Sequence, residues 1–196
     1  MKYPPKHYQD HNKLHMIEVI KEYPLATVIS VKDNQPLITH LPLVFEDDKL
    51  IGHIDKFNPH AELLKSKLPV SVIFHGPEAY ISPSLFKTKT LPTYNYIRVH
   101  LKGTVIEVVD KEALKTSLIK MTDFLEHPQH NYVLDANNKS MERNLNYIKM
   151  FEISIDSWEG KFKLSKDKSP EDFAIAKEEL IKINQISIKP LLKKIL

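Results

Sequence analysis

Polar and apolar residues alternate over residues 94–103. Tyr94, Tyr96, Arg98, His100 and Lys102 occupy one set of positions, and Asn95, Ile97, Val99, Leu101 and Gly103 occupy the other. A period of two predicts a β-strand with one largely apolar face, and we expect this strand to continue to about Val109. The opposite face carries rings and positive charge. It indicates a surface for a planar or anionic ligand or a second subunit, and a merely solvated face is an equally weighted alternative.

Other short apolar stretches predict further strands. One covers residues 70–75, is expected to break at Gly76-Pro77, resumes at residues 79–81 and stops at Ser82-Pro83. A second strand is predicted at residues 37–45, and Pro42 inside it requires an edge, a bulge or a barrel corner. The remaining strands are predicted at residues 25–31, 50–54, 151–155 and 161–165, with a turn at Glu159-Gly160 before the last.

Capping residues indicate where helices begin. Asp10 is expected to cap a helix that ends before Pro24, and Asp110 an amphipathic helix that ends before Pro128. Asn58 and Pro59 are expected to start a helix that runs to about Lys67. Further helices are predicted at residues 141–148, at residues 170–184 and in the basic tail, residues 186–196.

Strands in consecutive runs, with helices between them and at both ends, favour a mainly β fold with helices (α+β). The architecture expected is a small β-barrel with helical decorations. A doubly wound α/β sheet fits worse, because strands and helices do not alternate along the chain. We divide the chain into a barrel domain, residues 1–168, and a C-terminal helical extension, residues 169–196, packed on the same domain.

Composition narrows the chemistry. The chain has 196 residues and a net charge of +3, which is too weakly basic to imply nucleic-acid binding by itself. It has no cysteine, which excludes a disulfide, a thiolate nucleophile and cysteine-ligated metals. Four glycines without a phosphate-loop pattern exclude a Gly-rich nucleotide loop. No apolar run is long enough for a membrane span, and we expect a cytoplasmic protein without membrane contact.

The ten histidines are candidates for metal or catalytic sites. His7, His11 and His15 have the spacing of one helix face, but no carboxylate completes a metal site, so solvated histidines are the preferred interpretation and no metal is expected. No hydrolase motif is present, and a histidine near an Asp or Ser is expected by chance among ten histidines. The helix start at Asn58 is a candidate anion site beside the strands that carry His40 and His53, with simple capping as the alternative.

Several motifs together resemble the PaiB-type proteins, a family described as FMN-binding split-barrel negative transcriptional regulators. The resemblance spans residues 3 to about 173. The motifs are Thr39-His40-Leu41-Pro42, Gly52-His53, Asn58-Pro59, residues 72–77, residues 79–84, residues 92–96, Val99-His100 and residues 159–165. The resemblance implies an FMN-binding split β-barrel homodimer, with the flavin at the subunit interface.

The resemblance also implies a set of cofactor-binding residues. Asn58 and His60 match the positions of phosphate contacts in related split barrels, and His53 is expected below the flavin edge. Thr39 and His40 would add a hydroxyl and an imidazole. Four more residues, partly from the second subunit, would close over the rings: Tyr80, Ser82, Tyr94 and Asn95.

The chain departs from the family pattern at several positions, and one of these departures matters for binding. Thr39, His40 and His60 replace the usual basic pair, which leaves Lys56 as the nearby fixed cation. Modest FMN affinity, improving below about pH 6.5 where histidine is protonated, is therefore expected. Leu85-Phe86 and Lys166-Asp167 replace other family residues, which affects the expected regulatory partner more than the fold.

Two functions follow from the resemblance: a flavin-binding transcriptional regulator and, as the alternative, a flavin-dependent oxidoreductase acting on a small molecule. A bare DNA-binding repressor is the weakest interpretation, since lysines and arginines are scattered over the chain. Direct DNA binding is expected to be weak. If it occurs, the tail lysines Lys189, Lys193 and Lys194 are its first candidates.

Overall fold

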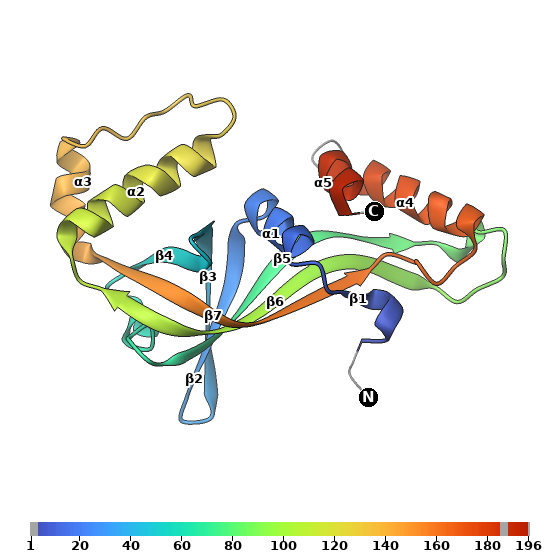
Figure 1. Ribbon diagram of the computed structural model, residues 1–196, viewed down its shortest axis with the longest axis horizontal. Coiled ribbons are helices and arrows are strands. Elements are labelled where there is room, and N and C mark those ends of the chain that lie inside the picture. The colour runs from blue at the N-terminus through green and yellow to red at the C-terminus, as the bar shows by residue number, and fades with distance from the viewer. Residues whose placement is uncertain (1–3, 185–187, 196) are drawn as a thin grey trace. The chain divides into compact units, whose positions relative to one another are not determined.

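The computed structural model describes residues 4–184 and 188–195, without the side chains of residues 188–190 (Figure 1). The strands are β1 (Gln9–Asp10), β2 (Leu25–Lys32), β3 (Gln35–Glu46), β4 (Lys49–Asp55), β5 (Pro69–Ile81), β6 (Thr93–Val108) and β7 (Ile148–Lys163). The α-helices are α1 (Lys13–Glu22), α2 (Lys111–Glu126), α3 (Lys139–Asn144), α4 (Pro170–Asn184) and α5 (Ile188–Ile195). Short 3₁₀ turns are η1 (Lys6–Tyr8), η2 (Pro59–Glu62), η3 (Pro83–Leu85) and η4 (Leu145–Tyr147).

The strands form one sheet in the order β1-β7-β4-β3-β2-β5-β6, and an additional β7–β6 pairing closes it. Closure removes the open edges that a flat sheet would expose. The mainly β barrel with helical decorations is therefore confirmed. Pro42 lies where β3 changes partner, since it is paired with Leu25 of β2 and the next residue, Leu43, is paired with Gly52 of β4. A proline is tolerated at such a corner because it has no N–H to donate.

The chain divides into two compact units. One unit, called the barrel unit here, comprises residues 24–72 and 102–157. Its interior is built from inward-facing side chains of β2, β3, β4 and β7, and Val28, Leu43, Leu50 and Phe151 are fully buried. Gly52 on β4 is needed for this packing, because a Cβ there would lie 2.4 Å from Leu43 Cδ2 and 2.8 Å from Phe151 Cζ.

Helix α2 belongs to the barrel unit and begins as predicted. Asp110 Oδ1 accepts a hydrogen bond from the Ala113 N–H at 2.6 Å, so the expected cap is confirmed. Leu114 of α2 packs with Met141 and Leu145, which come from α3 and the turn that follows it. This contact holds α3 beside the start of α2 (Figure 1).

The other unit, called the helical unit here, comprises residues 1–23, 73–101 and 158–196. Its helices bury their apolar faces among themselves and on the strands, with Val19 of α1, Leu180 of α4 and Leu191 of α5 almost inaccessible. On β6 the predicted alternation is confirmed, because Ile97, Val99 and Leu101 are buried while the residues between them are partly exposed.

Three local expectations are wrong. The turn at Glu159-Gly160 does not form, since β7 runs without interruption to Lys163. Gly160 instead allows β1 to approach, because a Cβ would lie 2.7 Å from the Asp10 carbonyl oxygen. The break at Gly76-Pro77 is also absent from β5. Helix α1 is capped not by Asp10 but by Asn12, whose Oδ1 accepts from the Leu14 N–H at 3.0 Å.

The helix expected from Asn58 to about Lys67 is wrong in length. Only the four-residue turn η2 forms, and Asn58 Oδ1 accepts from the His60 N–H at 2.9 Å. A single 3₁₀ turn has little dipole, and its first free N–H is already used by the cap. The argument that a helix N-terminus binds phosphate here therefore fails, and any anion site at this place must rest on side chains.

Candidate functional site

Thr39 and His60 meet in the barrel unit. Thr39 lies on β3 and His60 in η2, and Thr39 Oγ1 is 2.9 Å from His60 Nδ1. His60 is only 1% exposed, whereas Thr39 is partly exposed. The sequence placed these two residues in one site, and the structure brings them into contact.

Burial fixes the charge state of His60. Desolvation lowers the pKa of its imidazole from the ordinary value, so the ring is neutral near pH 7. Among the described residues nothing pairs with its buried Nε2. The sequence predicts that His60 becomes protonated below about pH 6.5, and this burial shifts that protonation to a lower pH.

His40 lies next to Thr39 in sequence but is on the opposite face of β3. It pairs with Thr27 of β2, with Thr27 Oγ1 3.2 Å from His40 Nδ1, and its side chain is exposed. Three exposed apolar residues share this face of the hairpin: Leu25, 59% exposed, Val31, 65% exposed, and Ile38, 56% exposed. The hairpin therefore presents a surface that is partly apolar and partly hydrogen-bonding.

His53 does not join this group. It lies on β4 and its Nε2 is 2.9 Å from Ser117 Oγ of α2, while its neighbours Gly52 and Ile54 face the barrel interior. Burial lowers the pKa of His53 to about 4, and its Nδ1 is buried without a partner among the described residues. The structure thus places His53 beneath α2 and not beside Thr39 or His60.

The remaining predicted residues belong to the helical unit. Tyr80 and Tyr94 are 51% and 48% exposed and are open to a ligand or a partner. Asn95 is 1% exposed and accepts a hydrogen bond from the Ser165 hydroxyl at 3.0 Å, so it serves the interior. Ser82 caps the turn η3 through its hydroxyl, 3.3 Å from the Ser84 N–H.

Arg98, on the charged face of β6, finds its partners within the chain. Arg98 Nη1 donates to the carbonyls of Gly76 and Ile97, at 2.8 Å each, and its guanidinium also pairs with Glu78. Arg98 lies 5.9 Å from the centre of the Tyr96 ring. Its positive charge is therefore engaged in holding β5 and β6 together.

Lys149 is a residue that the sequence did not indicate. It lies on β7, and its Nζ donates to the Ala61 carbonyl of η2 at 3.2 Å and pairs with Glu107 at 2.8 Å. The pKa of Glu62 is lowered first by Lys65, with smaller contributions from Lys149 and Lys32, which places both amines near η2. Because β7 is distant in sequence, only its pairing with β4, which sets Lys149 opposite Ile54, reveals this neighbour.

The histidines near the N-terminus do not converge on a metal. His15 Nδ1 pairs with Asp10 Oδ2 at 3.0 Å, and His7 contacts the Tyr8 ring. In the described part of the chain, no group of three or more potential ligands could hold a metal ion. Nor does any described helix combine the length and apolarity needed to cross a membrane.

In the C-terminal tail, Lys194 pairs with Glu18 of α1, and Lys193 remains exposed. The side chain of Lys189 lies outside the described residues. The positive charge of the tail is therefore partly neutralised within the helical unit.

The closed sheet, with its strand order and its helices, defines a split-barrel protein of the kind found among flavin-binding proteins. The chain matches the family described as "Putative FMN-binding domain" over residues 2–157, and it belongs to that family. A similar protein is "Protease synthase and sporulation protein PAI 2" of Bacillus subtilis, which is 31% identical over 184 residues, 91% of this chain and 88% of that protein. The resemblance to PaiB-type proteins is thereby confirmed.

More distant relatives extend to fungi and to solved structures. An uncharacterised protein of Saccharomyces cerevisiae is 31% identical over 62% of this chain and 88% of its own. The structure of an "FAD and Heme binding protein" from Mycobacterium smegmatis superimposes with a TM-score of 0.68 at 21% identity, covering 85% of this chain and 79% of that one. The flavocytochrome Anf3 of Azotobacter vinelandii gives a TM-score of 0.65 at 15% identity, covering 85% and 75%. At these identities the two structures establish the shared fold.

Proposed function

We propose that this protein binds FMN through the barrel unit and acts as a regulatory flavoprotein. The observation that carries the proposal is the Thr39–His60 pair, in which a buried, neutral imidazole bonds a partly exposed hydroxyl and keeps its Nε2 without a partner among the described residues. Buried polar atoms without partners are uncommon and mark places that a ligand or rearrangement completes. Family membership supports the choice of flavin.

In this proposal the phosphate is bound by side chains. When His60 Nδ1 donates to Thr39, the Thr39 hydroxyl proton is free for a phosphate oxygen. Lys56 donates to the Asn146 carbonyl at 3.3 Å and supplies positive charge near η2. Lys149, which bonds the Ala61 carbonyl, would contribute by exchanging its ion pair with Glu107 for the phosphate. Asn58 positions His60 through its cap. His40 lies on the opposite face of β3 and would reach only a part of the ligand that extends over that face.

We further propose that the protein is a homodimer. Val31 and Ile38 leave an apolar surface on the β2–β3 hairpin that a second copy would cover. The exposed rings of Tyr80 and Tyr94, contributed by that second copy, are candidates to contact the flavin. Exposed aromatic side chains are enriched in such interfaces.

The regulatory role is supported by the name of the Bacillus subtilis relative, a protease synthase and sporulation protein. A flavin-dependent oxidoreductase is the second candidate, and the similar folds of a flavocytochrome and of an FAD- and heme-binding protein favour it. Direct DNA binding is expected to be weak and strongly salt-dependent, because a net charge of +3 supports few phosphate contacts. The ion pair of Lys194 reduces the charge of the tail further.

One experiment tests the function and separates the two candidates. The visible spectrum of the purified protein incubated with FMN and desalted is recorded before and after adding NADH or NADPH. We expect part of the flavin to be lost on desalting, as modest affinity requires, and the bound remainder not to be bleached by either nucleotide within minutes. Loss of all flavin on desalting, together with no binding in an equilibrium titration, would reject flavin binding. Rapid bleaching with turnover would instead make the protein an oxidoreductase.

A further inference from the structure

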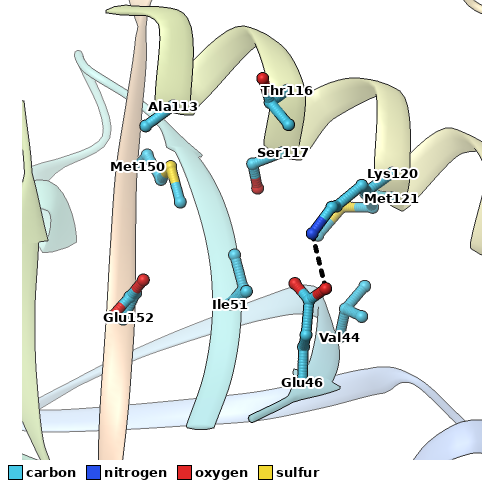
Figure 2. A pocket seen from close by; sticks show the side chains of 10 residues that line it. All are labelled: Val44, Glu46, Ile51, Ala113, Thr116, Ser117, Lys120, Met121, Met150 and Glu152. Atoms are coloured by element: carbon cyan, nitrogen blue, oxygen red, sulfur yellow. Dashed lines mark hydrogen bonds and ion pairs between the residues drawn. The ribbon is translucent and has the colours of Figure 1, made fainter. Parts of the chain in front are cut away.

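A cavity of about 250 Å³ lies in the barrel unit between α2 and strands β3, β4 and β7 (Figure 2). Its apolar wall is formed by Val44, Ile51, Ala113, Met121 and Met150. The polar groups that line it are the hydroxyls of Thr116 and Ser117 and the charged side chains of Glu46, Lys120 and Glu152. Neither Thr39 nor His60 lines this cavity, so it is distinct from the flavin site proposed above.

The cavity exists because α2 places small side chains against the sheet. Ala113 and Ser117 are one helical turn apart and both face the strands, where a helix that packs tightly would carry larger apolar residues. Met121 and Met150, which line the same space, have flexible side chains that adapt to differently shaped ligands. The arrangement therefore leaves room for a ligand at a place where packing would otherwise stabilise the helix.

The charges around the cavity are already paired. Lys120 Nζ lies 2.6 Å from Glu46 Oε1, as the dashed line in Figure 2 shows, and Lys49 Nζ lies 2.6 Å from Glu152 Oε2. A charged ligand would have to separate one of these pairs or remain without a counter-ion against an apolar wall. Charge complementarity therefore favours a neutral ligand.

One hydrogen-bonding position remains available on α2. Ser117 Oγ points from the helix toward β4 and is bonded to His53 Nε2 at 2.9 Å. The neutral imidazole can donate to Ser117 or accept from it, depending on its tautomer. The Ser117 hydroxyl can correspondingly donate to a ligand carbonyl or accept from a ligand N–H or O–H.

We propose that this cavity binds a small, neutral, ring-shaped molecule with one hydrogen-bonding group, held on Ser117 Oγ, with its apolar body against Met121 and Met150. The volume corresponds to roughly eight to ten heavy atoms, from the volume that a water molecule occupies in the liquid. Indole and simple phenols have this size and chemistry. The site is a second ligand site of the protein, and it does not depend on flavin binding.

Indole is the probe for the test. Its binding is followed by ¹H–¹⁵N chemical-shift titration of the full-length protein, with and without FMN. We expect saturable shifts centred on residues 113–121 and on His53. Ser117→Ala should weaken binding about tenfold, the effect of losing one hydrogen bond. Ser140→Ala, which removes an exposed hydroxyl on α3, is the matched control and should leave the affinity unchanged.

Two further arms make the proposal falsifiable. Ala113→Leu places a larger apolar side chain in the cavity from α2 and should abolish binding while the shift pattern outside α2 stays native. Indole-3-carboxylate should bind at least tenfold more weakly than indole, because its charge meets the paired Glu46 and Glu152. Absence of indole shifts, equal affinity of Ser117→Ala and the wild type, or tighter binding of the carboxylate would overturn the proposal.

Discussion

The carboxylate of Asp172, on α4, binds the backbone of the basic loop that follows β5. Its Oδ1 accepts from the Lys87 N–H at 2.8 Å and its Oδ2 from the Thr88 N–H at 3.3 Å. Although the side chain is only 2% exposed, the loop residues it binds are exposed. The loop between β5 and β6 is thus held by a residue that is distant in sequence.

This relationship predicts an acid-sensitive loop. Burial alone would raise the pKa of Asp172, but hydrogen bonds from Thr88, Lys87 and Ser169 outweigh it and lower the pKa below its usual value. A lowered pKa in the folded state gives stability that is present above the unfolded pKa, about 3.9, and is lost as the pH falls further. We expect Asp172→Asn to be less stable at pH 7 and to lose less stability between pH 5 and pH 3. Urea unfolding measures both, and an unchanged pH dependence would contradict the assignment.

The burial of His53 predicts a second loss of folding stability as the pH falls, in the same direction as for Asp172. The pKa of His53 is about 4 in the folded protein and about 6.5 when unfolded, so the unfolded state binds the proton first as the pH falls. Stability is complete above pH 6.5 and decreases as the pH falls toward 4, by about 2 kcal/mol between pH 7 and pH 5. Denaturant unfolding of His53→Gln should lack this component. An equal pH dependence in the variant and the wild type would show that His53 is not buried as described.

Gly103 predicts a strong packing effect in the barrel unit. A Cβ at this position would lie 2.4 Å from the Ser154 carbonyl oxygen, which belongs to the backbone of β7 and cannot rotate away. Gly103→Ala should therefore destabilise the protein by about 2–4 kcal/mol. Gly52→Ala is the comparison, because the atoms it meets are side-chain ends of Leu43 and Phe151, and its cost should be smaller. Thermal unfolding ranks the two, and the reverse order would contradict this packing.

The hairpin surface predicts the oligomeric state. Light scattering at micromolar concentration should give the mass of a dimer, and Val31→Lys or Ile38→Lys should shift it toward the monomer, because the lysine would be buried without a partner. Val109 is 87% exposed and follows β6, outside the β2–β3 hairpin, so Val109→Lys is the control and should stay dimeric. A monomeric wild type would remove the proposed second copy from the flavin site.

Local signals predicted much of this fold. The alternation along β6 and the Asp110 cap of α2 are predictable, because each depends on neighbouring residues in the chain. The turn predicted at Gly160 is wrong, because the glycine is needed there for the close approach of β1. A glycine needed for close approach and a glycine needed for a turn look the same in a single sequence.

The candidate site was predictable only where its residues lie on elements that are neighbours in sequence. The pairing of Thr39 with His60 followed from two adjacent strands and the turn after them. The contact of His53 with Ser117 joins residues 64 positions apart and depends on where α2 packs, which no local pattern contains. Lys149 joins η2 because β7 pairs with β4, which places it opposite Ile54, and this long-range pairing is not visible in a local pattern.

The most direct test of the account is an FMN titration that compares two matched threonine variants. Thr39→Val removes the hydroxyl bonded to His60, and Thr104→Val removes a hydroxyl bonded to Asp156 at 3.0 Å elsewhere in the same unit. Flavin fluorescence at pH 7 measures the affinity. We expect Thr39→Val to weaken binding about tenfold to a hundredfold, the range for a hydrogen bond to a charged group, and Thr104→Val to match the wild type. Equal affinities for all three proteins, or no binding by the wild type at about 100 µM FMN, a concentration well above an ordinary cofactor Kd, would contradict a flavin site built on Thr39 and His60.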